Sequence, residues 1–195
     1  MGFVSQPVKL LNPDGEFVSG KGTLYRQVFT APVVSDNVSI HAAITSPATG
    51  TTVVTTGITQ PPRARVCRVK GSASGMTGNV VIVGKNYWGV VKTDTIALNG
   101  ASAVDGVVAF SSITSITVPA KINSSGDTVS VGGGLALGLH RQVSENSALY
   151  GTVDGVADSA LPVIVAANYT VTFATAANGV KVFAVGYVHV DLSNA

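Results

Sequence analysis

The sequence predicts an all-β protein: an antiparallel β-sandwich of the jelly-roll or Ig-like kind, preceded by an extended N-terminal arm. Three observations predict this fold class. Short segments in which apolar and polar residues alternate, rich in Val, Ile and Thr, recur along the chain. Asn-Gly and Asp-Gly pairs, which are typical of tight turns, separate such segments. Many short strands with glycine-rich turns are typical of sandwiches and barrels.

Residues 1–22 differ from the rest and predict the arm. They contain Pro7, Pro13 and several glycines, which disfavour a regular element, together with scattered apolar residues. An apolar arm without a place in its own core docks on a partner or on the rest of the domain, and the alternative is a disordered terminus. We expect docking, because disordered tails are usually more polar. The side chains expected to contact the partner are Phe3, Val4, Leu10 and Leu11.

The remainder, residues 23–195, predicts a single β-sandwich domain. Alternation indicates strands within residues 38–45, 65–70, 78–85, 114–119, 127–131, 169–173 and 180–192. Turns are expected at Asn99-Gly100, Asp105-Gly106 and Asp154-Gly155, and a tight hairpin at Asn178-Gly179. Only residues 144–151 suggest a helix, of one or two turns.

Residues 63–70 form the one dense basic run. In a regular strand Arg63 and Arg65 share one face, while Arg68 and Lys70 share the other. A charge divided between two faces is a poor platform for nucleic acid, and no aromatic residues are interleaved. We expect a partly exposed strand that pairs with acidic neighbours, and an acidic patch on a protein partner is the functional alternative.

Two further segments have structural interpretations. Residues 132–138 are glycine-rich but lack the Gly-Lys-Ser/Thr of a phosphate loop, so their glycines are expected to mark a bulge or a close approach of backbones. Cys67 is the only cysteine, which excludes an intrachain disulfide. We expect Cys67 to be a small core residue.

The segment Asn86–Gly89 contains the only tryptophan. It follows a predicted strand and is expected to be a turn. Tyr87 and Trp88 are therefore candidates for an exposed loop anchor in binding, and an aromatic closure of one end of the sandwich is the alternative.

No pattern for catalysis is present, and we expect the protein not to be an enzyme. A Gly-x-Ser-x-Gly elbow is absent, because Ala73 occupies the nucleophile position of the one similar segment. His41, His140 and His189 are far apart in sequence, and His41 is expected to be exposed. We expect no metal, no cofactor and no membrane span, and the net charge of +2 gives no reason to expect nucleic acid.

The composition bears on association. Charged residues make up 11% of the chain and hydrophobic residues 46%, against about 25% charged in an ordinary soluble domain. Weak charge repulsion leaves such a surface less protected against contact with neighbours. The alternative interpretation is a threonine-rich β domain that has this composition and does not associate with other chains. The start of the sequence lacks the features of a signal peptide, so we expect synthesis in the cytoplasm.

Residues 77–120, from "TGNVVIVGKNYWGVV" through "TDTIALNG" to "GVVAFSSITSITVPA", followed by "GDTVSVGGGLALGL", resemble small β-rich virion proteins of tailed bacteriophages. The opening "VKLLNPDGEFVSGKG" is similar to the start of phage structural proteins. The resemblance covers about half the chain and implies a non-enzymatic virion component with no catalytic residues.

Within that class the resemblance implies a capsid decoration, cement or head-fibre protein on the capsid surface. Its expected partners are the major capsid protein and copies of itself, a trimer being expected on a symmetry axis. A ring or connector subunit of the tail or neck is an alternative. An alternative of another class is a receptor- or glycan-binding module in which Tyr87 and Trp88 form the stacking surface.

Overall fold

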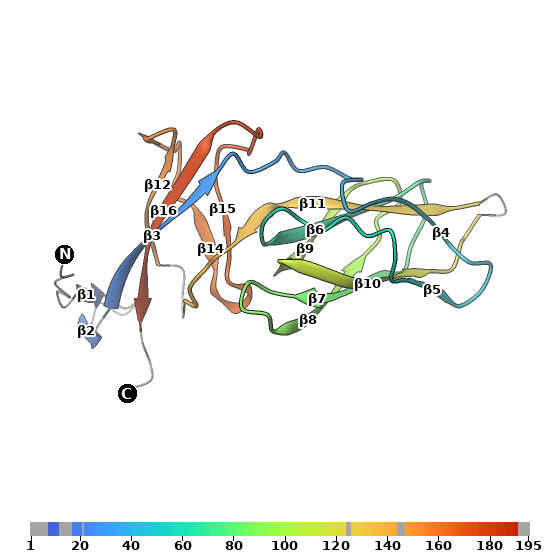
Figure 1. The fold of residues 1–195 in the computed structure, drawn as a ribbon, viewed down its shortest axis with the longest axis horizontal. Coiled ribbons are helices and arrows are strands. Elements are labelled where there is room, and N and C mark those ends of the chain that lie inside the picture. The colour runs from blue at the N-terminus through green and yellow to red at the C-terminus, as the bar shows by residue number, and fades with distance from the viewer. Residues whose placement is uncertain (1–7, 12–16, 21, 124–125, 144–146, 191–195) are drawn as a thin grey trace.

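The computed structural model describes residues 8–11, 17–20, 22–123, 126–143 and 147–190. Within these residues the regular elements are strands, apart from one 3-10 turn, η1 (Ala166–Asn168). All strand pairs are antiparallel, which confirms the predicted all-β sandwich class. Figure 1 shows an elongated molecule in which two groups of strands lie end to end.

A six-stranded sheet runs through both groups. Its order is β14 (Val163–Val165), β15 (Thr170–Thr172), β11 (Thr128–Gly138), β6 (Arg65–Gly71) and β9 (Val104–Phe110), with β4 (His41–Thr45) also paired to β11. Strand β11 is the longest element and extends from one group of strands into the other (Figure 1).

The first core lies between this sheet and a four-stranded sheet, and we call this half of the molecule the β6 lobe. The order of the second sheet is β5 (Thr51–Val54), β10 (Ser112–Pro119), β7 (Asn79–Lys85) and β8 (Val91–Ala97). Val80 and Ile82 alternate with more exposed residues along β7 and are completely buried. They pack in one cluster with Val69 and Val131 of the six-stranded sheet. Cys67 belongs to the same cluster, as predicted, and burial raises the pKa of its thiol.

The second core lies beneath another four-stranded sheet, and we call this half the β16 lobe. The order of that sheet is β13 (Val156–Ala157), β12 (Ala148–Val153), β16 (Val182–Val190) and β3 (Gly22–Thr30). Phe183, Val185 and Tyr187 point from β16 into a cluster that contains Leu137 of β11 and Val171 of β15. The C-terminal end of β11 therefore supports the second core, while its N-terminal half supports the first.

The described part of the predicted arm is a hairpin. Strand β1 (Val8–Leu11) pairs with β2 (Phe17–Gly20), and Leu10 and Leu11 face Val18 and Phe17 in its register. This sheet contains only its own two strands. The division into an arm of residues 1–22 and a single domain of residues 23–195 stays a prediction, although β3 already begins at Gly22.

The structure contradicts two local predictions. Residues 148–151, expected to be helical, belong to strand β12, where Tyr150 packs across Gly186 of β16. Asp105 and Gly106, expected to be a turn, lie within strand β9. The carboxylate of Asp94 occupies the space beside Gly106 and accepts hydrogen bonds from the next two backbone N–H groups of β9, at 2.9 and 3.0 Å.

The turn at Asn178-Gly179 exists but is not a hairpin. Gly179 has a φ of +79°, and the side chain of Asn178 accepts hydrogen bonds from the following backbone. The strands on either side, β15 and β16, belong to different sheets. Asn99-Gly100 and Asp154-Gly155 form turns as predicted.

Candidate functional site

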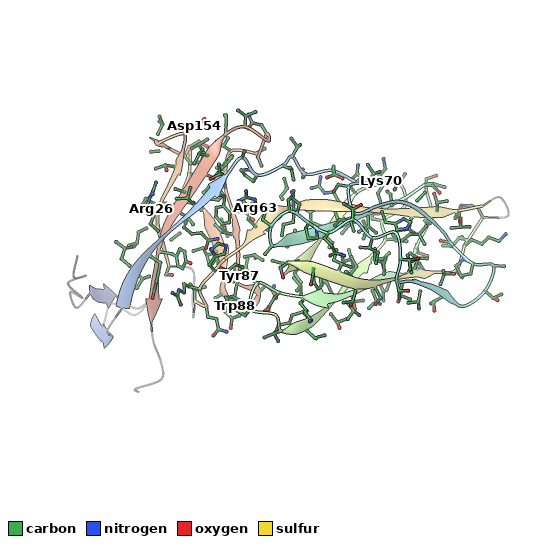
Figure 2. All side chains as sticks on the ribbon, viewed as in Figure 1. Arg26, Arg63, Lys70, Tyr87, Trp88 and Asp154 are labelled. Carbon is green, nitrogen blue, oxygen red and sulfur yellow. The ribbon has the colours of Figure 1, made fainter. Side chains whose placement is uncertain are left out.

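An open groove of about 450 Å³ lies where the two lobes meet. It is lined by β3, the turn between β7 and β8, the segment after β11, and β16. Figure 2 shows Tyr87 and Trp88 at this junction. We call it the aromatic groove, and its lining residues are Tyr25, Arg26, Gln27, Val28, Tyr87, Trp88, His140, Arg141 and Tyr187.

The turn that carries Tyr87 and Trp88 is built around Asn86. The side-chain oxygen of this buried residue accepts hydrogen bonds from the N–H groups of Trp88, at 3.1 Å, and Val90, at 3.0 Å. The hydroxyl of Ser111 donates to the Asn86 carbonyl at 2.6 Å. Gly89 completes the turn with a φ of +77°, a conformation that glycine adopts without strain. The turn therefore presents its aromatic residues from a fixed backbone.

The aromatic rings contact one another across the two lobes. Tyr87 stacks on His140, with ring centroids 4.0 Å apart and planes 13° from parallel. Trp88 meets Tyr169 edge to face at 5.1 Å and Tyr87 at 6.0 Å. Tyr87 nevertheless keeps 47% of its surface exposed. One face of its ring is covered by His140, and the exposed part is available to a ligand.

Gln27 fixes the floor of the groove. Its side chain is 5% exposed and joins β3 to the end of β11. The amide nitrogen donates to the Gly138 carbonyl at 3.1 Å, and the amide oxygen accepts from the His140 N–H at 2.8 Å and from the Tyr187 hydroxyl at 3.3 Å. A buried side chain with all these partners holds His140 beneath Tyr87.

The described lining of the groove is positive. Among the lining residues that the structure describes there are two arginines and neither Asp nor Glu. The guanidinium of Arg141 lies over the ring of Tyr25, 5.0 Å from the centroid, in a cation–π arrangement. Burial lowers the pKa of His140, and the charge of Arg63 lowers it further, so the imidazole is neutral at pH 7. Burial also raises the pKa of Tyr187 to about 12.

The basic run of residues 63–70 forms a second polar cluster, which is structural. The side chain of Arg65 is only 2% exposed, and its guanidinium donates to the carbonyls of Gly134 and Val33, each at 3.1 Å. Arg68 forms a salt bridge with Asp105, so the predicted pairing with an acidic neighbour is confirmed.

Along β6, Arg68 and Lys70 are both half-buried and alternate with the buried Val69, as predicted for residues of one face. The Arg68 guanidinium also reaches Ser35, in the same loop that accepts from Arg65. The register between β6 and β9 shifts between Val66 and Arg68, where the extra residues lie in β9 opposite Cys67. Burial of Arg65 removes it from any surface that could meet a partner.

The structure places the sequence-predicted residues in three different ways. Tyr87 and Trp88 lie together in the aromatic groove, as a loop anchor requires. Leu10 and Leu11 lie in the β1–β2 hairpin, and Phe3 and Val4 lie outside the described residues. His41 is half-buried rather than exposed, and its Nδ1 is buried without a hydrogen-bond partner among the described residues.

Sequence reasoning missed the rest of the groove. Tyr25, Gln27, His140 and Tyr187 come from segments far apart in the chain, and none of them belongs to a motif. The one signal of the groove in the sequence was that His140 and Arg141 follow the glycine-rich segment.

The described residues contain no group of His, Cys, Asp and Glu side chains arranged to hold a metal ion. They also contain no helix with the length and apolar character needed to cross a membrane. No family model, no curated protein and no solved structure matches the chain.

Proposed function

We propose that the protein is a non-enzymatic structural component of a bacteriophage virion that decorates the capsid exterior and bridges shell subunits. The virion setting rests on the sequence resemblance. One structural observation carries the assembly role: exposed apolar side chains on and between the outer strands β13 and β14.

The apolar edge consists of Val156, Leu161, Val163 and Val165. Strands β13 and β14 stand at the ends of the strand orders of their sheets. Val156 is 71% exposed and Val163 is 55% exposed, while Ile164 between the two outward valines of β14 points into the core. An edge strand with exposed apolar side chains pairs readily with another chain, and monomeric proteins usually avoid it. We infer that this edge contacts a neighbouring subunit.

The low charge of the surface supports the same role. Charged residues make up 11% of the chain. Few charges are therefore available to oppose contact with neighbours. Each valine of the edge would contribute about 1.5–3 kcal/mol on burial, before the cost of ordering the interface.

The test is the copy number of the protein in purified particles, measured by quantitative mass spectrometry against the major capsid protein. A fixed ratio to the capsid protein is expected for a decoration protein. A small number that matches a ring would support the alternative, a neck or tail subunit. Absence from particles would overturn the virion proposal.

The aromatic groove favours a second candidate function, a receptor- or glycan-binding module. Tyr87 and Trp88 lie side by side in an open cavity, on a turn that is fixed by Asn86. Rigid, partly exposed aromatic side chains are typical anchors of binding sites. This function is compatible with a place on the virion surface, where a groove would face other molecules.

A further inference from the structure

We propose that the aromatic groove binds a saccharide that carries a carboxylate group, with Tyr87 as the stacking ring and Arg141 as the partner of the carboxylate. The inference rests on the second candidate function and specifies its ligand. It does not depend on assembly through the apolar edge.

The exposed ring of Tyr87 suits the C–H face of a sugar. An aromatic face carries partial negative charge and offers apolar area, and both favour contact with the weakly positive C–H groups of a pyranose. His140 supports the ring from behind at 4.0 Å, and the floor beneath is fixed by Gln27. The stacking surface is therefore preorganised, and a ligand does not have to order it.

Arg141 gives the groove its expected preference for an acidic ligand. Its guanidinium is held over Tyr25 by a cation–π contact, and no carboxylate is among the lining residues that the structure describes. Among the described residues the one salt bridge involves other side chains, Arg68 and Asp105. A guanidinium binds a carboxylate through two parallel hydrogen bonds, a geometry that a neutral hydroxyl cannot match. A ligand with a carboxylate near its stacked ring would satisfy both groups.

Single-stranded nucleic acid also stacks on aromatic rings, but it fits this groove less well. Binding of a strand requires a track of basic residues along several phosphates. The groove contains two arginines, and its histidine is neutral at pH 7. In the basic run, Arg65 is buried and donates to backbone carbonyls, and Arg63 donates to the carbonyl of Thr30. The charges suit one carboxylate better than a chain of phosphates.

The fluorescence of Trp88 can be used to measure ligand binding. It is the only tryptophan of the chain and lies in the groove, so its fluorescence reports on this site alone. The full chain is titrated with oligosaccharides that contain glucuronate, galacturonate or sialic acid, with neutral oligosaccharides of equal length, and with an oligothymidylate. We expect saturable binding of at least one acidic probe, and weaker or no binding of its neutral counterpart.

Three variants locate the interaction. Arg141→Gln is expected to weaken the acidic probe by roughly 10–100-fold and to leave the neutral probe unchanged, since it removes a charged hydrogen bond. Tyr87→Ala is expected to weaken both probes by about tenfold or more. Lys70→Gln removes the same charge from the β6 lobe, away from the groove (Figure 2), and is expected to change neither. Thermal melting of each variant checks that it is folded.

Three results would overturn the proposal: no acidic probe binding below millimolar concentration, oligothymidylate binding as tightly as the best acidic probe, or an Arg141→Gln variant that keeps the preference for acid. Because these titrations use the purified chain, a negative result leaves the copy number in particles unaffected. A failure of the groove and a failure of the virion proposal are therefore distinguishable.

Discussion

At the scale of single residues, three consecutive glycines of β11 allow other parts of the molecule to approach its backbone. A Cβ atom at Gly133 would lie 2.7 Å from the guanidinium carbon of Arg65, and one at Gly134 would lie 2.6 Å from a methyl of Val66. A Cβ at Gly132 would collide with the backbone carbonyl of Asp36. The sequence prediction of close backbone approach in this segment is thereby confirmed.

Gly132→Ala is expected to lower the free energy of unfolding by about 2–3 kcal/mol, because the carbonyl carbon and oxygen of Asp36, which crowd this position, belong to backbone and cannot rotate away. Urea unfolding measures the change. Gly50→Ala is the matched control: nothing lies within 4 Å of its Cβ position, and only its φ of +71° opposes alanine. That control should cost about 1 kcal/mol. Equal losses in the two variants would contradict the role of crowding.

At the scale of elements, the N-terminal hairpin and strand β3 differ in how they pair with the rest of the fold. Strand β3 is paired with β16 over its whole length, from Gly22↔Val190 to Thr30↔Val182. Among the described residues, strands β1 and β2 pair with each other and with none of the other sheets. We therefore expect the hairpin to serve contacts outside the domain.

Removal of residues 1–20, which leaves β3 intact, is expected to preserve a cooperative thermal transition and to abolish attachment to capsid shells. The reason is that, among the side chains that the structure describes, both cores are built by β3 and the segments that follow it. Calorimetry measures the first outcome and co-sedimentation with shells the second. Loss of cooperative melting would show that this segment belongs to the folded domain.

At the scale of the whole molecule, the two lobes give the protein separate surfaces. The apolar edge lies on the β16 lobe, and the aromatic groove opens where the lobes meet. Strand β11 belongs to the sheet shared by both cores, so the lobes are connected by more than a loop. A neighbour on the apolar edge and a ligand in the groove would therefore occupy different sites.

The purified protein is expected to be a trimer, with a mass by light scattering of about three times the 19.7 kDa chain. The double variant Val163→Lys, Val165→Lys should shift the mass to that of the monomer, because charges on an edge strand oppose pairing. Val53→Lys, on edge strand β5 of the other lobe and 59% exposed, is the control and should keep the trimer. A monomeric wild-type chain would contradict self-association, though not attachment to a capsid.

Local structure could be predicted from the sequence where residues that are close together in the chain determine the conformation. The alternation in β7 places Val80 and Ile82 in the core because successive side chains of a strand face opposite sides. The turn at Asn86 is encoded by a polar side chain and by Gly89, which takes positive φ without strain. Tyr87 and Trp88 could be predicted as a candidate anchor for the same reason.

By itself the sequence determined the all-β class, most strand faces and three of the four turn positions. It also determined that Tyr87 and Trp88 lie on a turn. These features depend on short-range sterics and on the spacing of apolar residues along the chain. Only the tertiary structure decided the rest. Asp94 keeps Asp105 and Gly106 in a strand, and the turn at Asn178-Gly179 joins two sheets. The groove gathers residues between positions 25 and 187, and such convergence is set by how sheets pack, which no local pattern records.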